Sequence, residues 1–482
     1  MMRLVLCALL VSVAVPARAV VPTPTVIGPI TSPGGAFITP PSSLVLSEFG
    51  YVEEEFFVAG TARAQTTVNP LGADGNWTAT PDGATAPYET RILVRRPISP
   101  KQFNGTVIVE WLNVSGGLDA APDWTFLHPF LKREGYAWVG VSAQFQGVAG
   151  VGGPLGLSLS LKSVSPIRYG PLVHPGDSFS YDMFSQVAQA LRQPGARVLG
   201  GLAPRRLIAI GESQSAFRMT TYVNAVHPTA HVYDGFLIHS RSGGAAALSQ
   251  SPQPSITAPT PSYVRGDVDV PVLIFETETD LITLGYFPAR QDDLGNIRTW
   301  EVAGTAHDDA YGLNAGPNDA GKAALDTTYL PPQTSVFGVI NCANPINQGP
   351  QHYVLSAAVR RLNRWVRTGH VRGGPTSPRL EIGAGPSLVL DTLGNAVGGI
   401  RTPQVDVPIA RLSGLGQSGG FCSLFGTTVP LDAGTLASLY PTHGAYVRAI
   451  VQSARKTVRA GFVTRIDATA IKAAAASSNV GG

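Results

Sequence analysis

Short, uninterrupted apolar runs recur through the middle of the chain, and helical patterns separate several of them. Runs of this length fill the strands of a parallel sheet that is covered on both faces. Strands that alternate with helices predict an α/β fold, with a mostly parallel central sheet and helices on both faces. The predicted strands are residues 106–112, 136–143, 207–210, 233–239, 270–275 and 298–302.

Further patterns flank these runs. Residues 48–64 and 88–95 have β-type apolar and aromatic content, which predicts antiparallel edge strands ahead of the parallel core. Residues 70–87, between them, are rich in turn formers. Apolar side chains at helical spacing predict helices around residues 181–191 and 354–365.

The first 19 residues predict a secretory signal peptide. Arg3 precedes an apolar run, and the sequence Ala17-Arg18-Ala19 matches a small-x-small cleavage site. The run is too short to span a bilayer, and no later stretch approaches spanning length. We therefore expect an exported protein, periplasmic or secreted, that is cut after Ala19 and has no membrane span.

The rest of the chain, residues 20–482, has room for one large α/β domain with insertions or for two domains. We expect a single domain with its catalytic core in residues 40–372. The order of elements is less regular after Gly373, so residues 373–482 are interpreted as a C-terminal extension packed on that core. An independent module is the alternative.

Charge is sparse, at 14% of the residues, and the formal net charge is +3. No run of lysine or arginine marks a nucleic-acid or membrane-surface partner, so we expect neither. The expected partner is a small-molecule substrate. No metal or cofactor is expected.

Two of the three cysteines lie beyond the predicted signal peptide. Cys342 and Cys422 lack metal-ligand spacing, and two cysteines in an exported chain are expected to form a disulfide. Two buried free thiols are the alternative.

One predicted strand leads directly into a turn with a central serine. The residues Gly211-Glu-Ser-Gln-Ser215 follow the run 207–210, and a helical stretch comes after them. Strand, tight turn and helix form the context of a nucleophile elbow, which exposes a serine hydroxyl above the sheet. Ser213 is therefore the candidate nucleophile. An ordinary strand–helix turn is the alternative, and Ser215 stands where glycine is usual.

Serine needs a base to take its proton, and the base needs an acid to orient it. In α/β-hydrolases these residues occur in the order serine, acid, histidine, each after a different strand. Asp280 follows the strand 270–275 and His307 follows the strand 298–302, so both have the right place and order. Glu276 and Glu278 compete with Asp280 for the role of the acid.

Negative charge that develops on a substrate oxygen needs preorganised N–H donors. One is expected from the backbone of Gln214, at the start of the helix after the serine. The second is expected from the loop after the strand 106–112, where Asn113 and Val114 are the candidates. A plain glycine turn is the alternative for this loop.

Two further polar residues follow the strand 233–239. Arg241 is a candidate for binding a substrate carboxylate, although a buried structural salt bridge is an equal alternative. His239 is a candidate pocket residue.

Several segments together resemble a bacterial family of exported proteins called "α/β hydrolase domain". This resemblance implies the α/β-hydrolase fold and a serine hydrolase in which Ser213 and His307 have their usual roles; it names no substrate. The matching segments are residues 110–114, 138–144, 211–215, 233–241, 300–307 and 421–425.

The predicted function is that of an exported serine hydrolase that cleaves a carboxylic ester through an acyl-enzyme. An acyltransferase, lactonase or amidase with the same triad is an alternative. A non-catalytic binding protein on a hydrolase scaffold is the alternative from another class.

Overall fold

The computed structural model describes residues 20–153, 156–193, 195, 197–369 and 374–482. The predicted signal peptide lies outside these described residues. Within the part of the chain that is described, no helix is both long and apolar enough to cross a membrane.

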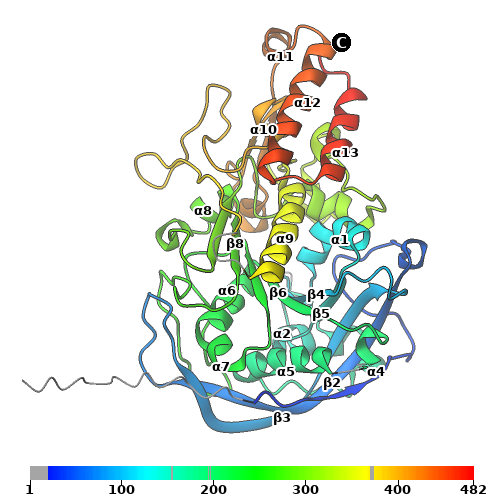
Figure 1. Cartoon of the computed structure of the whole chain (residues 1–482), viewed down its shortest axis with the longest axis vertical. Helices are drawn as coiled ribbons and strands as arrows, with labels where there is room; N and C mark the ends of the chain where they lie inside the picture. Colours follow the sequence, from blue (N-terminus) through cyan, green and yellow to red (C-terminus); the bar gives the residue numbers. More distant parts are fainter. Residues whose placement is uncertain (1–19, 154–155, 194, 196, 370–373) are drawn as a thin grey trace, which may run out of the picture.

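A nine-stranded sheet runs through the molecule in the order β1-β2-β3-β5-β4-β6-β7-β8-β9 (Figure 1). The strands from β5 through β4 and β6 to β9 pair in parallel, and β1, β2 and β3 form an antiparallel edge. The predicted mostly parallel sheet is thus confirmed. The nine strands are β1 (Thr25–Ile27), β2 (Tyr51–Thr67), β3 (Ala79–Pro97), β4 (Thr106–Trp111), β5 (Ala137–Val141), β6 (Arg206–Glu212), β7 (Gly235–His239), β8 (Val272–Glu276) and β9 (Ile297–Glu301).

The antiparallel edge is longer than the sequence pattern predicts. Strand β3 begins at Ala79, inside the segment 70–87 that is rich in turn formers, and it pairs with β2 along most of its length. A register shift between Arg63 and Gln65 accommodates the irregular part. Pairing with a long neighbouring strand therefore overrides the local turn preference of this segment.

The parallel strands are buried on both faces. Every residue of β4 is buried, and its side chains alternate between two apolar clusters, with Val107 and Val109 in one and Ile108 in the other. This arrangement explains why the strands read as continuous apolar runs in the sequence.

Helices cover both faces of the sheet (Figure 1). Helices α5 and α6 pack in the cluster that contains Val107, and α1 and α9 pack in the cluster that contains Ile108. The helices are α1 (Pro122–Glu134), α2 (Phe145–Ala149), α3 (Leu161–Val164), α4 (Pro166–Tyr169), α5 (Ser180–Arg192), α6 (Gln214–Thr221), α7 (His227–Ala230), α8 (Glu278–Ile282), α9 (Gln351–Thr368), α10 (Pro403–Asp406), α11 (Ala433–Leu439), α12 (His443–Ala460) and α13 (Arg465–Ala476).

The C-terminal segment shares this core. Ile450 of α12 and Ile471 of α13 are buried in the same cluster as residues of α1 and α9. A disulfide joins Cys342, ahead of α9, to Cys422 in the C-terminal segment. Two small hairpins lie in these regions: β10 (Ser335–Val336) with β11 (Ile340–Asn341), and β12 (Ala410–Ser413) with β13 (Thr427–Pro430).

A buried charge network joins the antiparallel edge to the loop after β4. The fully buried Arg91 of β3 donates to Asp119 Oδ2 at 2.7 Å and to Ser142 Oγ at 2.8 Å. Asp119 adjoins Ala120, whose backbone N–H and carbonyl pair with those of Asn113. The network therefore fixes the base of the loop that contains Asn113.

The substitution Arg91→Met should lower the free energy of unfolding by about 3–5 kcal/mol, because it leaves the Asp119 carboxylate buried without its cationic partner. The matched control is Lys456→Met. Lys456 is 77% exposed and lies 3.7 Å from Asp406, so its loss should cost about 0–1 kcal/mol. Urea denaturation followed by tryptophan fluorescence measures both values. Equal losses would contradict the structural role of Arg91.

Candidate active site

The turn after β6 has the conformation of a nucleophile elbow. Ser213 has φ 58° and ψ −119°, and α6 begins at the next residue. A positive φ is uncommon outside glycine and is maintained only where the surroundings enforce it. Gly211 permits the close approach of strand and helix, since a Cβ there would lie 2.9 Å from the Ser215 carbonyl oxygen. Ser215, where glycine is usual, is fully buried.

The three residues predicted to act together meet at one edge of the sheet. Ser213 Oγ lies 2.8 Å from His307 Nε2, and His307 Nδ1 lies 2.6 Å from Asp280 Oδ1. They follow β6, β9 and β8, whose carboxyl ends share that edge. The geometry is that of a serine, a base and an orienting acid.

Asp280 is held by the first turn of α8. Its Oδ2 accepts hydrogen bonds from the Thr277 N–H and the Thr277 hydroxyl, both at 2.7 Å. Burial alone raises the pKa of this carboxyl, but the contacts with His307 and Thr277 outweigh burial and lower the pKa below 3.8. Asp280 is therefore ionised at neutral pH and holds a proton on His307 Nδ1.

The competing glutamates point elsewhere. Glu278 Oε1 accepts from the Gly304 N–H at 2.6 Å, and Glu278 Oε2 accepts from the Gly414 N–H at 2.8 Å. Glu276 is fully buried and has no hydrogen-bond partner for its carboxylate among the described residues. Asp280 therefore contacts His307, whereas Glu276 and Glu278 do not.

Sequence reasoning missed the residue directly before the serine. Glu212 Oε1 lies 3.2 Å from His307 Nε2, the atom that also faces Ser213 Oγ. Its Oε2 accepts a hydrogen bond from Asn113 Nδ2 at 3.1 Å. Burial raises the pKa of Glu212 well above 4.5. Its position at the end of β6, next to the nucleophile, was the available signal.

Asn113 and Val114 are the two candidate oxyanion donors on the loop after β4. The Asn113 N–H donates to the Ala120 carbonyl at 2.9 Å, and the Asn113 side chain holds Glu212. This placement argues against Asn113 as a backbone donor to substrate, because its N–H is already used. Val114 remains the candidate on this loop. Gln214 is the first residue of α6, where N–H groups have no partner within the helix.

Arg241 and His239 are both buried and do not line the cavity beside Ser213. Arg241 is fully buried and donates to backbone carbonyls, including that of Ser242 at 3.0 Å, so it is not placed to bind a substrate carboxylate. His239 is also buried; its Nδ1 lies 2.8 Å from Asp123 Oδ1, and its backbone carbonyl accepts from the Ser213 N–H at 2.9 Å. Burial lowers the pKa of His239 to about 3.

A cavity of about 260 Å³ opens beside Ser213 and His307. Of the described residues that line it, the only other ionisable ones are Glu212 and Asp308, and no lysine or arginine takes part. Burial raises the pKa of Asp308 to about 6. The rest of the wall is largely apolar and includes Phe126, Leu313, Phe421 and Phe425.

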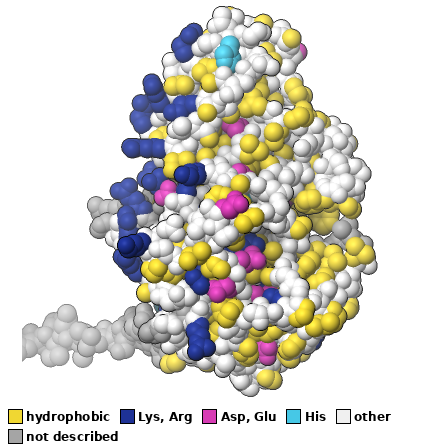
Figure 2. Space-filling model, turned by 90° about the vertical axis from the view of Figure 1, so that its right-hand side faces the viewer, with side chains coloured by type: hydrophobic (Ala, Val, Ile, Leu, Met, Phe, Trp, Pro, Cys, Tyr) yellow, Lys and Arg dark blue, Asp and Glu magenta, His cyan; other side chains and the backbone are white. Residues whose placement is uncertain are grey.

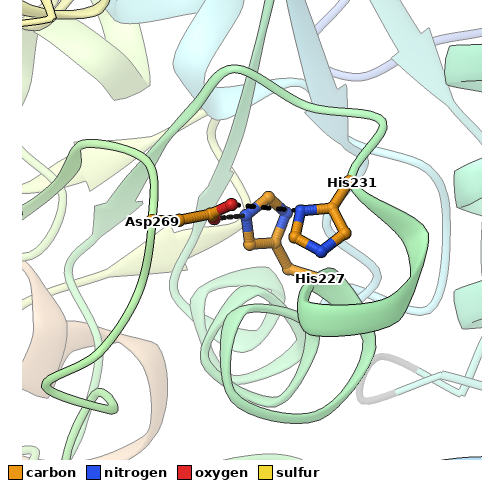
Figure 3. Close-up of side chains that lie close together, drawn as sticks. All are labelled: His227, His231 and Asp269. Carbon is orange, nitrogen blue, oxygen red and sulfur yellow. Dashed lines mark hydrogen bonds and ion pairs between the residues drawn. The ribbon is translucent and has the colours of Figure 1, made fainter. Parts of the chain in front are cut away.

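One group of described residues has the composition of a metal site, away from the cavity. Asp269 Oδ1 lies 2.8 Å from His227 Nε2, and Asp269 Oδ2 lies 3.2 Å from His231 Nδ1 (Figure 3). A metal on Nε2 would leave the ring proton of His227 on Nδ1, which is buried without a hydrogen-bond partner among the described residues. The contacts instead tie α7 to the segment before β8.

Comparison with known proteins gives the family. Residues 22–473 match the alpha/beta hydrolase domain family, and the chain belongs to it. No curated protein matches the chain in sequence.

Solved structures with a similar arrangement include two esterases. An esterase of Rhizomucor miehei is 10% identical, with a TM-score of 0.26, over 50% of this chain and 74% of its own. The carboxylesterase Cest-2923 from Lactobacillus plantarum is 10% identical, with a TM-score of 0.26, over 47% of this chain and 78% of its own. Likeness at this level carries no argument about this chain; the α/β-hydrolase fold follows from the family match and from the sheet.

The environment of His307 gives a measurable prediction. Burial alone lowers the pKa of His307, but the carboxylates of Asp280 and Glu212 outweigh burial and raise the pKa to about 9. The substitution Glu212→Gln replaces one of the two carboxyl groups that favour the imidazolium and should therefore lower the pKa of His307. Titration of ¹⁵N-labelled imidazoles by NMR measures the pKa.

Glu278→Gln is the matched control, since the Glu278 carboxylate binds the backbone of Gly304 and Gly414. It should leave the pKa of His307 nearly unchanged. An equal decrease in both variants would contradict a specific action of Glu212.

Proposed function

We propose that the protein is a serine esterase that cleaves a carboxylic ester through an acyl-enzyme on Ser213. The observation that carries this proposal is the unbroken hydrogen-bonded series from Ser213 Oγ through His307 to Asp280. Membership of a hydrolase family supports the same reading. The hydrogen-bonded triad and the strained turn at Ser213 would have no role in a non-catalytic scaffold.

In the proposed mechanism, Ser213 Oγ attacks the ester carbonyl while the neutral form of His307 takes its proton at Nε2. Activity is therefore expected to rise as the pH approaches the His307 pKa of about 9. Asp280 holds the other ring nitrogen and stabilises the imidazolium that forms. The N–H groups of Gln214 and Val114 are proposed to bind the oxyanion. His307 then gives the proton to the leaving alcohol, and water releases the acid by the reverse steps.

The cavity supports an uncharged ester with an apolar group on its acyl or alcohol side. Its wall offers Phe126, Leu313 and other apolar side chains, and the carboxylates of Glu212 and Asp308 disfavour an anionic substrate. Acyl transfer, or cleavage of a lactone or amide, would use the same triad.

Export is part of the proposal. The disulfide between Cys342 and Cys422 supports it, because disulfides persist in oxidising compartments. The protein is proposed to act in the periplasm or outside the cell.

The substitution Ser213→Ala should reduce hydrolysis of p-nitrophenyl acetate by about 10³-fold or more and should abolish labelling by a fluorophosphonate probe. The nucleophile is lost while the fold is kept, which circular dichroism checks. Ser215→Ala is the control, since Ser215 is fully buried and its hydroxyl has no partner among the described residues. Activity retained in Ser213→Ala but lost in Ser215→Ala would move the nucleophile to Ser215.

The substitution Asp280→Asn should lower kcat by about 10⁴-fold, the loss that follows when the orienting aspartate of a serine triad becomes asparagine. The neutral amide no longer stabilises the imidazolium of His307. Glu278→Gln should have a much smaller effect, because the Glu278 carboxylate accepts from the N–H groups of Gly304 and Gly414 and from the Ser413 hydroxyl, and does not contact His307. Steady-state kinetics compare the two variants, and the reverse ranking would show that Asp280 is not the acid.

A further inference from the structure

Arginines that are scattered in the sequence gather around one groove on the molecule. The groove has a volume of about 540 Å³, and Figure 2 shows lysine and arginine side chains collected along one edge of the view. Glu134 is the only acidic residue among the described residues that line it. We call it the arginine groove; its arginines are Arg206, Arg360, Arg361, Arg364, Arg367, Arg459 and Arg465.

Helix α9 supplies four of these side chains. Arg360, Arg364 and Arg367 are spaced by four and three residues, so they lie on one exposed helical face, with Arg361 beside them. The opposite face of α9, with Leu362 and Trp365, is buried against the sheet.

Three other elements complete the groove. Arg206 is the first residue of β6, Arg459 lies in the last turn of α12, and Arg465 is the first residue of α13. Because Arg206 begins β6 and Ser213 follows its end, the groove lies at the amino ends of the parallel strands. The candidate active site lies at their carboxyl ends, so a ligand in the groove would not touch the triad.

The charges of the groove are not balanced by the protein itself. No carboxylate of the described residues is within 4.0 Å of any of the seven guanidinium groups, and Glu134 instead lies 3.8 Å from Arg133. Several arginines outside the groove do have a carboxylate partner, as Arg290 has Glu301 at 2.6 Å. Burial and repulsion from Arg364 and Arg360 lower the pKa of Arg361, which shows how closely the positive charges approach one another.

A groove of this kind favours a compact anion with several charges. Like charges in a hollow surface build a positive potential, and an anion relieves their mutual repulsion. Guanidinium groups bind phosphate through two parallel hydrogen bonds, which makes arginine the preferred residue for such sites. The volume lies within the range of small-molecule sites, and a hollow of this size suits a small ligand better than a flat membrane or a long polymer.

We propose that the arginine groove is a binding site for a small ligand that carries several phosphate groups. The site is separate from the proposed esterase site and does not depend on it. Helix α9 supplies the main phosphate contacts, and the ends of α12 and α13 close the groove from the other side.

Isothermal titration calorimetry of the full chain with tripolyphosphate tests this proposal. We expect saturable binding of one tripolyphosphate per chain, with an affinity that falls as salt rises from about 50 mM to about 200 mM. The double variant Arg364→Gln/Arg367→Gln should bind about tenfold more weakly or worse, since two charge-assisted contacts are lost.

The matched control is Arg197→Gln/Arg411→Gln, which removes the same charge from two exposed arginines outside the groove. It should bind tripolyphosphate within about twofold of the unmodified protein, because surface charges far from the site are screened. Both double variants change exposed positions only, and their thermal unfolding verifies that the fold is retained.

Three outcomes would overturn the proposal. The first is the absence of binding at low salt, and the second is equal weakening in the two double variants, which would indicate diffuse attraction. The third is a preference for another kind of anion. Citrate that binds as tightly as tripolyphosphate would show this, and so would binding to single-stranded DNA or to anionic vesicles without binding to tripolyphosphate. Loss of esterase activity in Ser213→Ala bears on none of these readouts.

Discussion

The structure of the site depends on the backbone conformation of one residue. Ser213 holds a positive φ that a serine does not favour, at a cost of about 1–3 kcal/mol. Its N–H donates to the His239 carbonyl, and its own carbonyl accepts from Ala216 N–H at 2.9 Å at the start of α6. These bonds, with Gly211 beneath the helix, fix the direction of the hydroxyl, and every other group of the site is placed relative to it.

Buried carboxyl groups join the elements around that turn. Glu110, at the end of β4, accepts from the N–H groups of Asp123 and Trp124, which anchors the start of α1. Asp123 in turn bonds to His239, whose carbonyl holds the Ser213 N–H. An isolated buried carboxylate is costly, but here each one has a donor that belongs to a different element. The network therefore ties β4, α1, β7 and the elbow into one unit.

Charge is separated across the sheet. The carboxyl ends of the strands hold the triad with Glu212 and Asp308, beside an apolar cavity without lysine or arginine among the described residues. The amino ends hold the arginine groove. A net charge of only +3 conceals this separation, because the sum over the chain says nothing of where the charges lie. The two surfaces are thus proposed to bind different ligands, an uncharged ester and a polyanion.

The sequence alone determined the α/β class, the elbow at Ser213 and the order of Asp280 and His307, because apolar period and strand exits are local signals. Tertiary structure decided the rest. Asn113 and Arg241 lie at the positions that the sequence predicts, but their polar groups are already bonded. Asn113 contacts Ala120 and the distant Glu212, and Arg241 donates to backbone carbonyls. The contacts of Glu212 and the grouping of the seven groove arginines depend on separate elements that only packing brings together. Spacing along a chain reports which face of an element a side chain occupies; what stands opposite that face is set by packing.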